Sequence, residues 1–145
     1  MIPTQFETWQ KQIPMIDLMG VKPLYTSEYV LENQVKFEPN ENEKHSVLGG
    51  SLTSACALSG WMICSGSFEK SSVSIIKQDS EFTAPVSRDF IVRVTVSPDE
   101  LDVVKQKMQV RGRSSMKVTA QVFEVGSPTV AMQANMVYVI EKFKN

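Results

Sequence analysis

The longest uncharged stretch of the chain runs from Ser46 to Phe68 and reads SVLGGSLTSACALSGWMICSGSF. Of its 23 residues, only twelve are apolar, and eleven are serine, threonine or glycine. A membrane-spanning helix needs about 20 predominantly apolar residues, so this stretch is too polar to cross a bilayer. Because a helix without a charged side has no face suited to water, we expect a helix over about 50–67 that is buried within the fold.

The sequence on both sides of this helix is dominated by alternation of apolar and polar residues, the period of a half-buried strand. Strands are expected over 21–37, 73–83, 87–97, 114–125 and 128–142, with short helices over 4–12 and 14–19 and a polar loop over 38–48. Ser97 and Glu100 form a capping-box pattern that starts a further helix, which ends near Gly112. Strands clustered after one central helix indicate an α+β fold, with an antiparallel sheet curled around helix 50–67.

Composition narrows the classes of function. A chain of 145 residues is expected to form a single domain over 1–145. Its formal net charge of −1 lacks the basic excess of a nucleic-acid binder, so no nucleic-acid partner is expected. The first twelve residues have no signal-peptide pattern. Cys56 and Cys64, about 12 Å apart along one helix, are too distant for a disulfide, so we expect two reduced thiols in a cytoplasmic protein.

The residues around the central helix also carry a family resemblance. They are Pro39-Asn40-Glu41-Asn42, Lys44, Gly49-Gly50-Ser51-Leu52 and Leu58-Ser59-Gly60-Trp61, with supporting matches at Ile13-Pro14, Met19-Gly20-Val21 and Pro85. Over about residues 13–142 the chain resembles the hot-dog-fold acyl-coenzyme A thioesterases, and most of all a thioesterase-like domain that also occurs fused behind N-acetyltransferase domains.

This resemblance implies a hot-dog fold, in which an antiparallel sheet wraps around a long helix. It also implies a homodimer, or a dimer of two dimers, that hydrolyses acyl-coenzyme A or acyl-carrier-protein thioesters at a site between two subunits. No cofactor is implied beyond the coenzyme A of the substrate.

The sequence departs from this family at two positions. Leu48 stands where the family often has phenylalanine, and Ala57 stands near the place where many related thioesterases carry an acid. Because the helix has no carboxylate, a non-catalytic module that binds acyl thioesters, or is regulated by them, is a second interpretation. A hydroxyacyl-thioester dehydratase is a third, weakened because such enzymes pair a catalytic histidine with an acid and His45 is the only histidine.

Gly49 and Gly50 are the first candidates for the site. Free N–H groups and partial positive charge gather at a helix N-terminus, and without Cβ atoms a substrate carbonyl can approach the backbone closely. Gly50 is therefore a candidate for an oxyanion hole with Gly49 beside it, the alternative being a tight turn without a ligand. Asn40 and Asn42, just before the helix, either contact the substrate and the attacking water or stabilise the loop.

Asp79 and Glu81 share one face of the predicted strand over 73–83. In a hot-dog dimer this strand of one subunit lies near the glycine pair of the other. Asp79 is therefore the candidate for the general base on water, or for the nucleophile. The alternative is a strand face that is simply solvated.

The remaining candidates would contact the rest of the substrate. Met62 and Phe82, with Met136, are expected to contact the acyl chain. Arg111 and Arg113, in a basic run over 105–117, either bind the phosphates of coenzyme A or form a solvated helix face.

His45 and Ser51 lie close to the glycine pair in sequence and are expected to contact the substrate, although a surface loop and a helix start are the alternatives. Ser51 departs from the nucleophile-elbow pattern, which ends in glycine. One histidine and two cysteines do not supply an ordinary zinc site, so no metal is expected.

Overall fold

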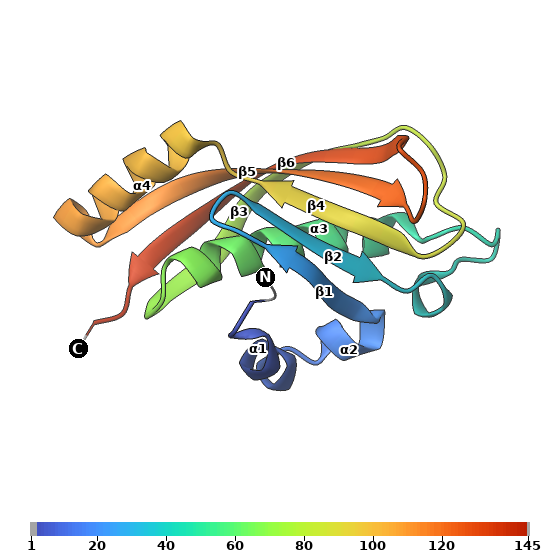
Figure 1. Ribbon diagram of the computed structural model, residues 1–145, viewed down its shortest axis with the longest axis horizontal. Helices are drawn as coiled ribbons and strands as arrows, with labels where there is room; N and C mark the ends of the chain where they lie inside the picture. The colour runs from blue at the N-terminus through green and yellow to red at the C-terminus, as the bar shows by residue number, and fades with distance from the viewer. Residues whose placement is uncertain (1–2, 145) are drawn as a thin grey trace.

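The computed structural model describes residues 3–144, and Figure 1 shows a curved sheet with a long helix along one face. In chain order the elements are α1 (Phe6–Gln12), α2 (Met15–Met19), β1 (Val21–Thr26), β2 (Val30–Val35), the 3-10 turn η1 (Glu38–Asn40), α3 (Gly49–Ser67), β3 (Ser71–Phe82), β4 (Phe90–Thr95), α4 (Pro98–Arg111), β5 (Arg113–Glu124) and β6 (Val130–Lys142). The expected α+β fold, with a sheet around a long helix, is confirmed.

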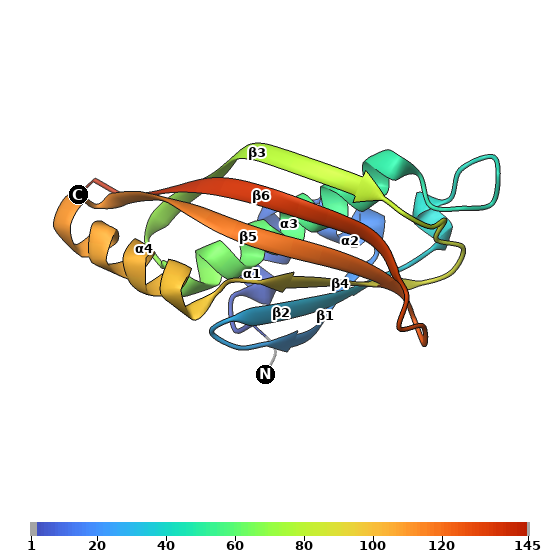
Figure 2. The ribbon, with the colours of Figure 1, turned by 90° about the horizontal axis from the view of Figure 1, so that it is seen from above.

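The sheet has six strands in the order β1-β2-β4-β5-β6-β3, and every neighbouring pair is antiparallel. β1 and β3 are therefore its two edges, and β3 lies along one border of the sheet in Figure 2. β3 pairs with β6 over its whole length, from Ser71 opposite Lys142 to Phe82 opposite Met132. The other side of this twelve-residue strand has no pairing partner among the described residues.

The prediction of one strand over 21–37 was wrong, because the chain reverses there to form the hairpin β1–β2. The Ser27 N–H donates to the Val30 carbonyl at 2.8 Å, and the Val30 N–H donates to the Ser27 hydroxyl at 3.2 Å. A serine side chain thus completes the turn without any glycine, proline or asparagine. The apolar–polar alternation continues on both sides of the turn, so periodicity alone did not reveal it.

α3 is the buried helix that the uncharged stretch predicted. Its buried residues, which include Leu52, Cys56 and Met62, join the main hydrophobic core. Its buried Ser59 is satisfied locally, since the Ser59 hydroxyl donates to the Ala55 carbonyl one turn earlier at 2.8 Å. The Asn33 amide of β2 donates to that same hydroxyl at 2.9 Å, which ties the helix to the sheet.

The small residues of α3 let the sheet approach closely, as expected. The Tyr138 hydroxyl of β6 donates to the Ala57 carbonyl at 2.6 Å. Directly beside it lies Gly60, where a Cβ would overlap the Tyr138 hydroxyl and lie 2.7 Å from Cζ of the ring. A glycine is therefore required at this position for the packing of α3 on β6.

The helix start at Ser97 is confirmed, but the capping box is not. The Ser97 hydroxyl accepts from the Glu100 N–H at 3.1 Å, as an N-cap should. The Glu100 carboxylate instead accepts from the Lys117 N–H of β5 at 2.7 Å. This contact joins α4 to the sheet, and the sequence pattern could not distinguish it from a box closed within the helix.

The two short helices α1 and α2 pack on the same side of the sheet as α3 (Figure 1). The rings of Trp9 on α1 and Trp61 on α3 meet edge to face, with centroids 5.4 Å apart. In α2, Ile16 and Met19 are buried and so fix the position of this helix. Within residues 3–144, no helix combines the length and the apolar character that crossing a bilayer requires.

Candidate active site

The N-terminus of α3 presents two backbone N–H groups to solvent. The helix is preceded by Leu48, whose carbonyl accepts from the N–H groups of Ser51 and Leu52 at 2.9 and 3.2 Å. Within the described residues, the N–H groups of Gly49 and Gly50 have no hydrogen-bond partner. Because no acidic side chain lies in the first turn, the positive end of the helix dipole is not neutralised there.

The two glycines differ in their surroundings. Both are exposed, and nothing lies within 4 Å of a Cβ built on Gly50. A Cβ on Gly49 would lie 3.9 Å from Cε1 of Phe82, at the end of β3. A ligand carbonyl can therefore reach the Gly50 backbone unhindered, with the Phe82 ring beside it.

The loop before α3 is held by Asn40, which is buried. Its side-chain amide donates to the carbonyls of Met19 at 2.9 Å and Lys36 at 2.7 Å, so both N–H donors are used. The backbone carbonyl of Asn40 accepts from the Leu48 N–H at 2.8 Å. This is the structural role weighed for Asn40, and it fixes the position of the helix start.

Asn42 closes the projecting loop over 41–47. Its side-chain carbonyl accepts from the N–H groups of Lys44 at 2.9 Å and Ser46 at 3.2 Å, and its amide donates to the Ser46 hydroxyl at 3.1 Å. His45, which has a positive φ of 62°, lies in this loop with Nδ1 2.6 Å from Glu41 Oε2. Its side chain is 84% exposed, which agrees with a surface position.

Two apolar grooves flank the glycine pair. We call the first the α2 groove: it has a volume of about 410 Å³ and is lined by Met15, Leu18, Met19, Pro39, Asn40, Leu48, Gly50, Ser51 and Ser54. We call the second the β3 groove: it has a volume of about 360 Å³ and is lined mainly by Val47, Gly49, Leu52, Phe82, Pro85 and Val86. The α3 N-terminus thus forms the ridge between two apolar surfaces.

The structure places Asp79 on the far face of β3 from α3. Gln78 donates to the Thr53 carbonyl of α3 at 3.2 Å, so the neighbouring Asp79 and Glu81 point the other way. The Asp79 side chain is 71% exposed, and its Oδ2 lies 3.8 Å from Nζ of Lys77. Within this chain, therefore, Asp79 is not brought together with the glycine pair.

The two cysteines are free and buried, as expected. Burial raises the pKa of the Cys56 thiol to about 12 and raises that of Cys64 as well, so both are protonated at neutral pH. A protonated buried thiol is a poor nucleophile. Ser51 lies half-buried in the first turn of α3, at the edge of the α2 groove.

Three of the proposed substrate contacts lie at the opposite end of the molecule. Met62 is fully buried in α3, twelve residues or about 18 Å along the axis from Gly50. Arg113 lies opposite Glu141 at the start of β5, and the carbonyl of Gly112, which follows Arg111, accepts from the Lys142 N–H at 2.8 Å. Since Lys142 pairs with Ser71, this basic segment lies beyond the C-terminus of α3.

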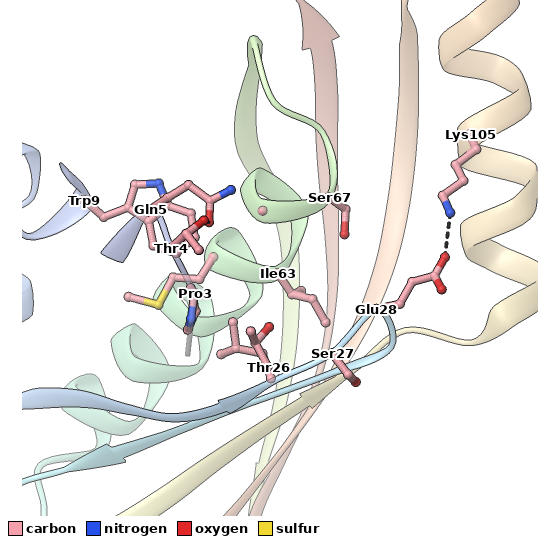
Figure 3. Close-up of a pocket in the computed structure, with 13 residues that line it drawn as sticks. Pro3, Thr4, Gln5, Trp9, Thr26, Ser27, Glu28, Ile63, Ser67 and Lys105 are labelled. Carbon is pink, nitrogen blue, oxygen red and sulfur yellow. Dashed lines mark hydrogen bonds and ion pairs between the residues drawn. The ribbon is translucent and has the colours of Figure 1, made fainter. Parts of the chain in front are cut away.

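Met62 lines a third cavity, of about 360 Å³, at that end of α3 (Figure 3). Trp9 and Gln5 form one side, Ile63 and Ser67 of α3 another, and Thr26 and Ser27 the floor. Its margin carries a hydrogen-bonded ion pair in which Lys105 Nζ lies 2.6 Å from Glu28 Oε1, and this contact raises the pKa of Lys105. The cavity is distant from the free N–H groups of α3.

The contribution of α2 to the site was missed at the sequence level. Met15 and Leu18 were placed only within the short helix expected over 14–19, yet they are 49% and 66% exposed beside Gly50. The available signal was a turn of five residues carrying four apolar side chains, more than so short a helix can bury.

The family model described as "Putative thioesterase (yiiD_Cterm)" matches residues 4–142. A Chlorobaculum tepidum protein of unknown function superposes with a TM-score of 0.85 at 18% identity, covering 98% of both chains. A "putative thioesterase" from Shewanella oneidensis gives 0.77 at 23% identity, covering 93% of both. A "probable thioesterase" from Pseudomonas aeruginosa gives 0.82 at 16% identity, covering 98% of this chain and 99% of the other. No curated protein matches the sequence.

Proposed function

This chain belongs to the putative thioesterase family, and we propose that it hydrolyses acyl-coenzyme A or acyl-carrier-protein thioesters at the N-terminus of α3, with a second subunit completing the site. The observation that carries the proposal is the pair of unpartnered N–H groups at Gly49 and Gly50, flanked by two apolar grooves. A thioester needs this combination, since its carbonyl oxygen gains negative charge while its acyl chain avoids water.

The chemistry follows from this arrangement. The thioester carbonyl oxygen accepts from the helix-end N–H groups, and a water molecule attacks the carbonyl carbon. The tetrahedral oxyanion is stabilised by the same donors and by the helix dipole. The carbon–sulfur bond then breaks, and the thiol leaves with a proton that came from the water. The products are a carboxylic acid and a free thiol.

Measurement of thiol release from a panel of acyl-coenzyme A thioesters tests this function. Release at a rate proportional to protein concentration supports hydrolysis. Saturable binding of the same thioesters without thiol release would instead favour the non-catalytic module. The absence of an acidic residue in α3 is the observation that supports this alternative. Water elimination from a 3-hydroxyacyl thioester, without thiol release, would favour the dehydratase.

The proposed dimer rests on the free edge of β3. Three of its apolar side chains are exposed, those of Ile75, Ile76 and Phe82, at 40%, 61% and 53%. An unpaired edge strand with exposed apolar side chains is a surface that pairs readily with a second copy. Pairing through β3 would also bring the partner subunit next to the β3 groove and the glycine pair.

We expect the purified protein to scatter light as a species of about twice the 16.2 kDa mass of one chain. Ile76→Lys is expected to yield monomers, because lysine on an edge strand opposes pairing. Val110→Lys, at a 78% exposed position on α4, is the matched control and should leave the dimer unchanged. A monomeric mass for the unsubstituted protein at micromolar concentration would refute this part of the proposal.

A two-fold dimer would also give the basic segment a role. Two β3 strands related by a two-fold axis run antiparallel, so the Phe82 end of one faces the Ser71 end of the other. Arg113 lies near Ser71, across β6. The partner subunit's Arg111 and Arg113 would then lie on the side of the site where the phosphates of coenzyme A emerge, and guanidinium groups bind phosphate well.

The identity of the general base can be tested separately from the role of the α3 N-terminus. We propose Asp79 for this role; because its side chain points away from α3 in its own protomer, and pairing through β3 leaves it on that outer face in both subunits, the role requires a further subunit contact through that face, as in a dimer of two dimers. Asp79→Asn nearly preserves the shape of the side chain and is expected to lower kcat about 100-fold, the lower end of what general-base assistance contributes. The readout is kcat for thiol release, alongside the melting temperature.

Glu81→Gln, on the same face of the same strand, is the control and should leave turnover near normal. If Asp79→Asn is as active as Glu81→Gln, then the carboxylate takes no part, and the helix end alone polarises the thioester for attack by water.

A further inference from the structure

The walls of the α2 groove are apolar and held in fixed positions. Met15 and Leu18 lie on α2, which the buried side chains of Ile16 and Met19 anchor to the core. The Gly20 carbonyl, just after α2, accepts from the Lys36 N–H at 3.2 Å, which fastens the end of this helix to the hairpin. Leu48 forms the opposite wall. The groove is therefore formed within one protomer.

The apolar side chains that form these walls are exposed to water, which is unfavourable in free energy unless a ligand covers them. Met15, Leu18 and Leu48 are 49%, 66% and 53% exposed, and all three border the same groove. Contiguous exposed apolar surface of this kind, beside a candidate catalytic group, is typical of a binding site. None of the described residues that line the groove is charged, so its occupant is neutral and apolar.

The groove continues directly into the free helix end, because Gly50 and Ser54 are part of its lining. When the thioester carbonyl oxygen accepts from the Gly50 N–H, the two groups on the carbonyl carbon extend in opposite directions. One is the acyl chain and the other is the sulfur with the carrier attached to it. The β3 groove adjoins the free sheet edge, where the polar carrier can pass to solvent or to a second subunit. The α2 groove lies on the other side and remains for the chain.

We propose that the α2 groove holds the acyl chain of the substrate, and that Leu18 and Ser54 determine which chain lengths are accepted. This inference rests on the proposed thioester hydrolysis and specifies its substrate as an aliphatic acyl thioester. At ~30 Å³ for each water-sized group, a groove of about 410 Å³ holds a chain of roughly a dozen carbons.

We expect kcat/KM to increase with acyl-chain length up to a defined length and then to stop increasing; we call that length the break. For saturated acyl-coenzyme A substrates, kcat/KM should rise about fourfold for each added methylene, which is the ~0.8 kcal/mol gained on removing that group from water. The rise should stop at about twelve carbons, where the groove is full.

Two variants of opposite kind test the assignment. Ser54→Phe fills the groove from an exposed helix position and should move the break to shorter chains while sparing acetyl-coenzyme A. Leu18→Gln removes part of the apolar wall and should make kcat/KM rise less steeply with chain length. The expected loss is about tenfold for a ten-carbon acyl chain, again sparing acetyl-coenzyme A. Val110→Gln, on α4, is the control and should reproduce the original profile.

Binding of non-hydrolysable alkyl thioether analogues of coenzyme A, measured by calorimetry, separates this inference from the proposed function. Chain-dependent affinity that Ser54→Phe and Leu18→Gln abolish supports the groove even if no thioester is hydrolysed. An unchanged profile in both variants overturns it. A profile altered instead by Phe82→Gln also overturns it, since the chain would then lie in the β3 groove.

Discussion

Replacing Gly50 with valine is expected to lower kcat/KM for thioester hydrolysis by about 100- to 1,000-fold, the cost of losing one oxyanion donor. A β-branched side chain at this position would stand in front of the N–H that the substrate carbonyl must reach. The protein should still fold, because nothing lies within 4 Å of a Cβ at Gly50 and its backbone is helical. The measurements are thiol release and the circular dichroism melting curve.

Gly66→Val is the matched control for this experiment. Gly66 lies in the last turn of the same helix, also exposed, and distant from the free N–H groups. We expect it to retain activity within about twofold even where its melting temperature changes. Near-normal hydrolysis by a folded Gly50→Val protein would remove the α3 N-terminus from the mechanism and leave only the fold assignment.

The second large effect is on stability. Gly60→Ala is expected to lower the free energy of unfolding by about 3–5 kcal/mol, combining overpacking with the loss of a buried hydrogen bond. The new Cβ would overlap the Tyr138 hydroxyl, and the ring cannot retreat without breaking its 2.6 Å hydrogen bond to Ala57. Burial also raises the pKa of Tyr138, so the hydroxyl stays a donor. Urea denaturation gives the free energy directly.

Two further variants make this prediction specific. In Gly66→Ala a Cβ would lie 3.8 Å from Cη2 of Trp9, an ordinary contact, so this exchange should be neutral or stabilising by up to about 1 kcal/mol. Adding Tyr138→Phe to Gly60→Ala removes the atom that overlaps most. The double variant should therefore lose less stability than the sum of the two single variants. Strict additivity would show that Gly60 and Tyr138 do not meet as described.

The candidate site shows where sequence reasoning stops. The glycine pair could be identified because a helix start without a capping side chain leaves its N–H groups free whatever the rest of the fold does. Asp79 and Glu81 could be placed on one face of a strand by the alternation of side chains alone. Whether that face points toward α3 or away from it depends on how β3 packs on the helix. The contact from Gln78 to Thr53 shows that it points away.

Local patterns therefore determined the elements of this protein. A helix without charged residues has to be buried, and strands that alternate apolar and polar residues have one apolar face to pack against it. Ser97 and Gly112 mark the start and end of α4 through local backbone geometry, which needs no distant partner. Each of these features depends on residues only a few positions apart in the chain.

Only the tertiary structure decided which residues meet. Met15 and Leu18 reach Gly50 across more than thirty residues of intervening chain, while Met62 and Arg113 are carried to the far end of α3. The hairpin at Ser27 reverses the chain without any strong turn signal, and it brings Lys36 back to Gly20 at the end of α2. Convergence of this kind is set by long-range packing of the core, whose free energy is shared among many residues and leaves no local trace in the sequence.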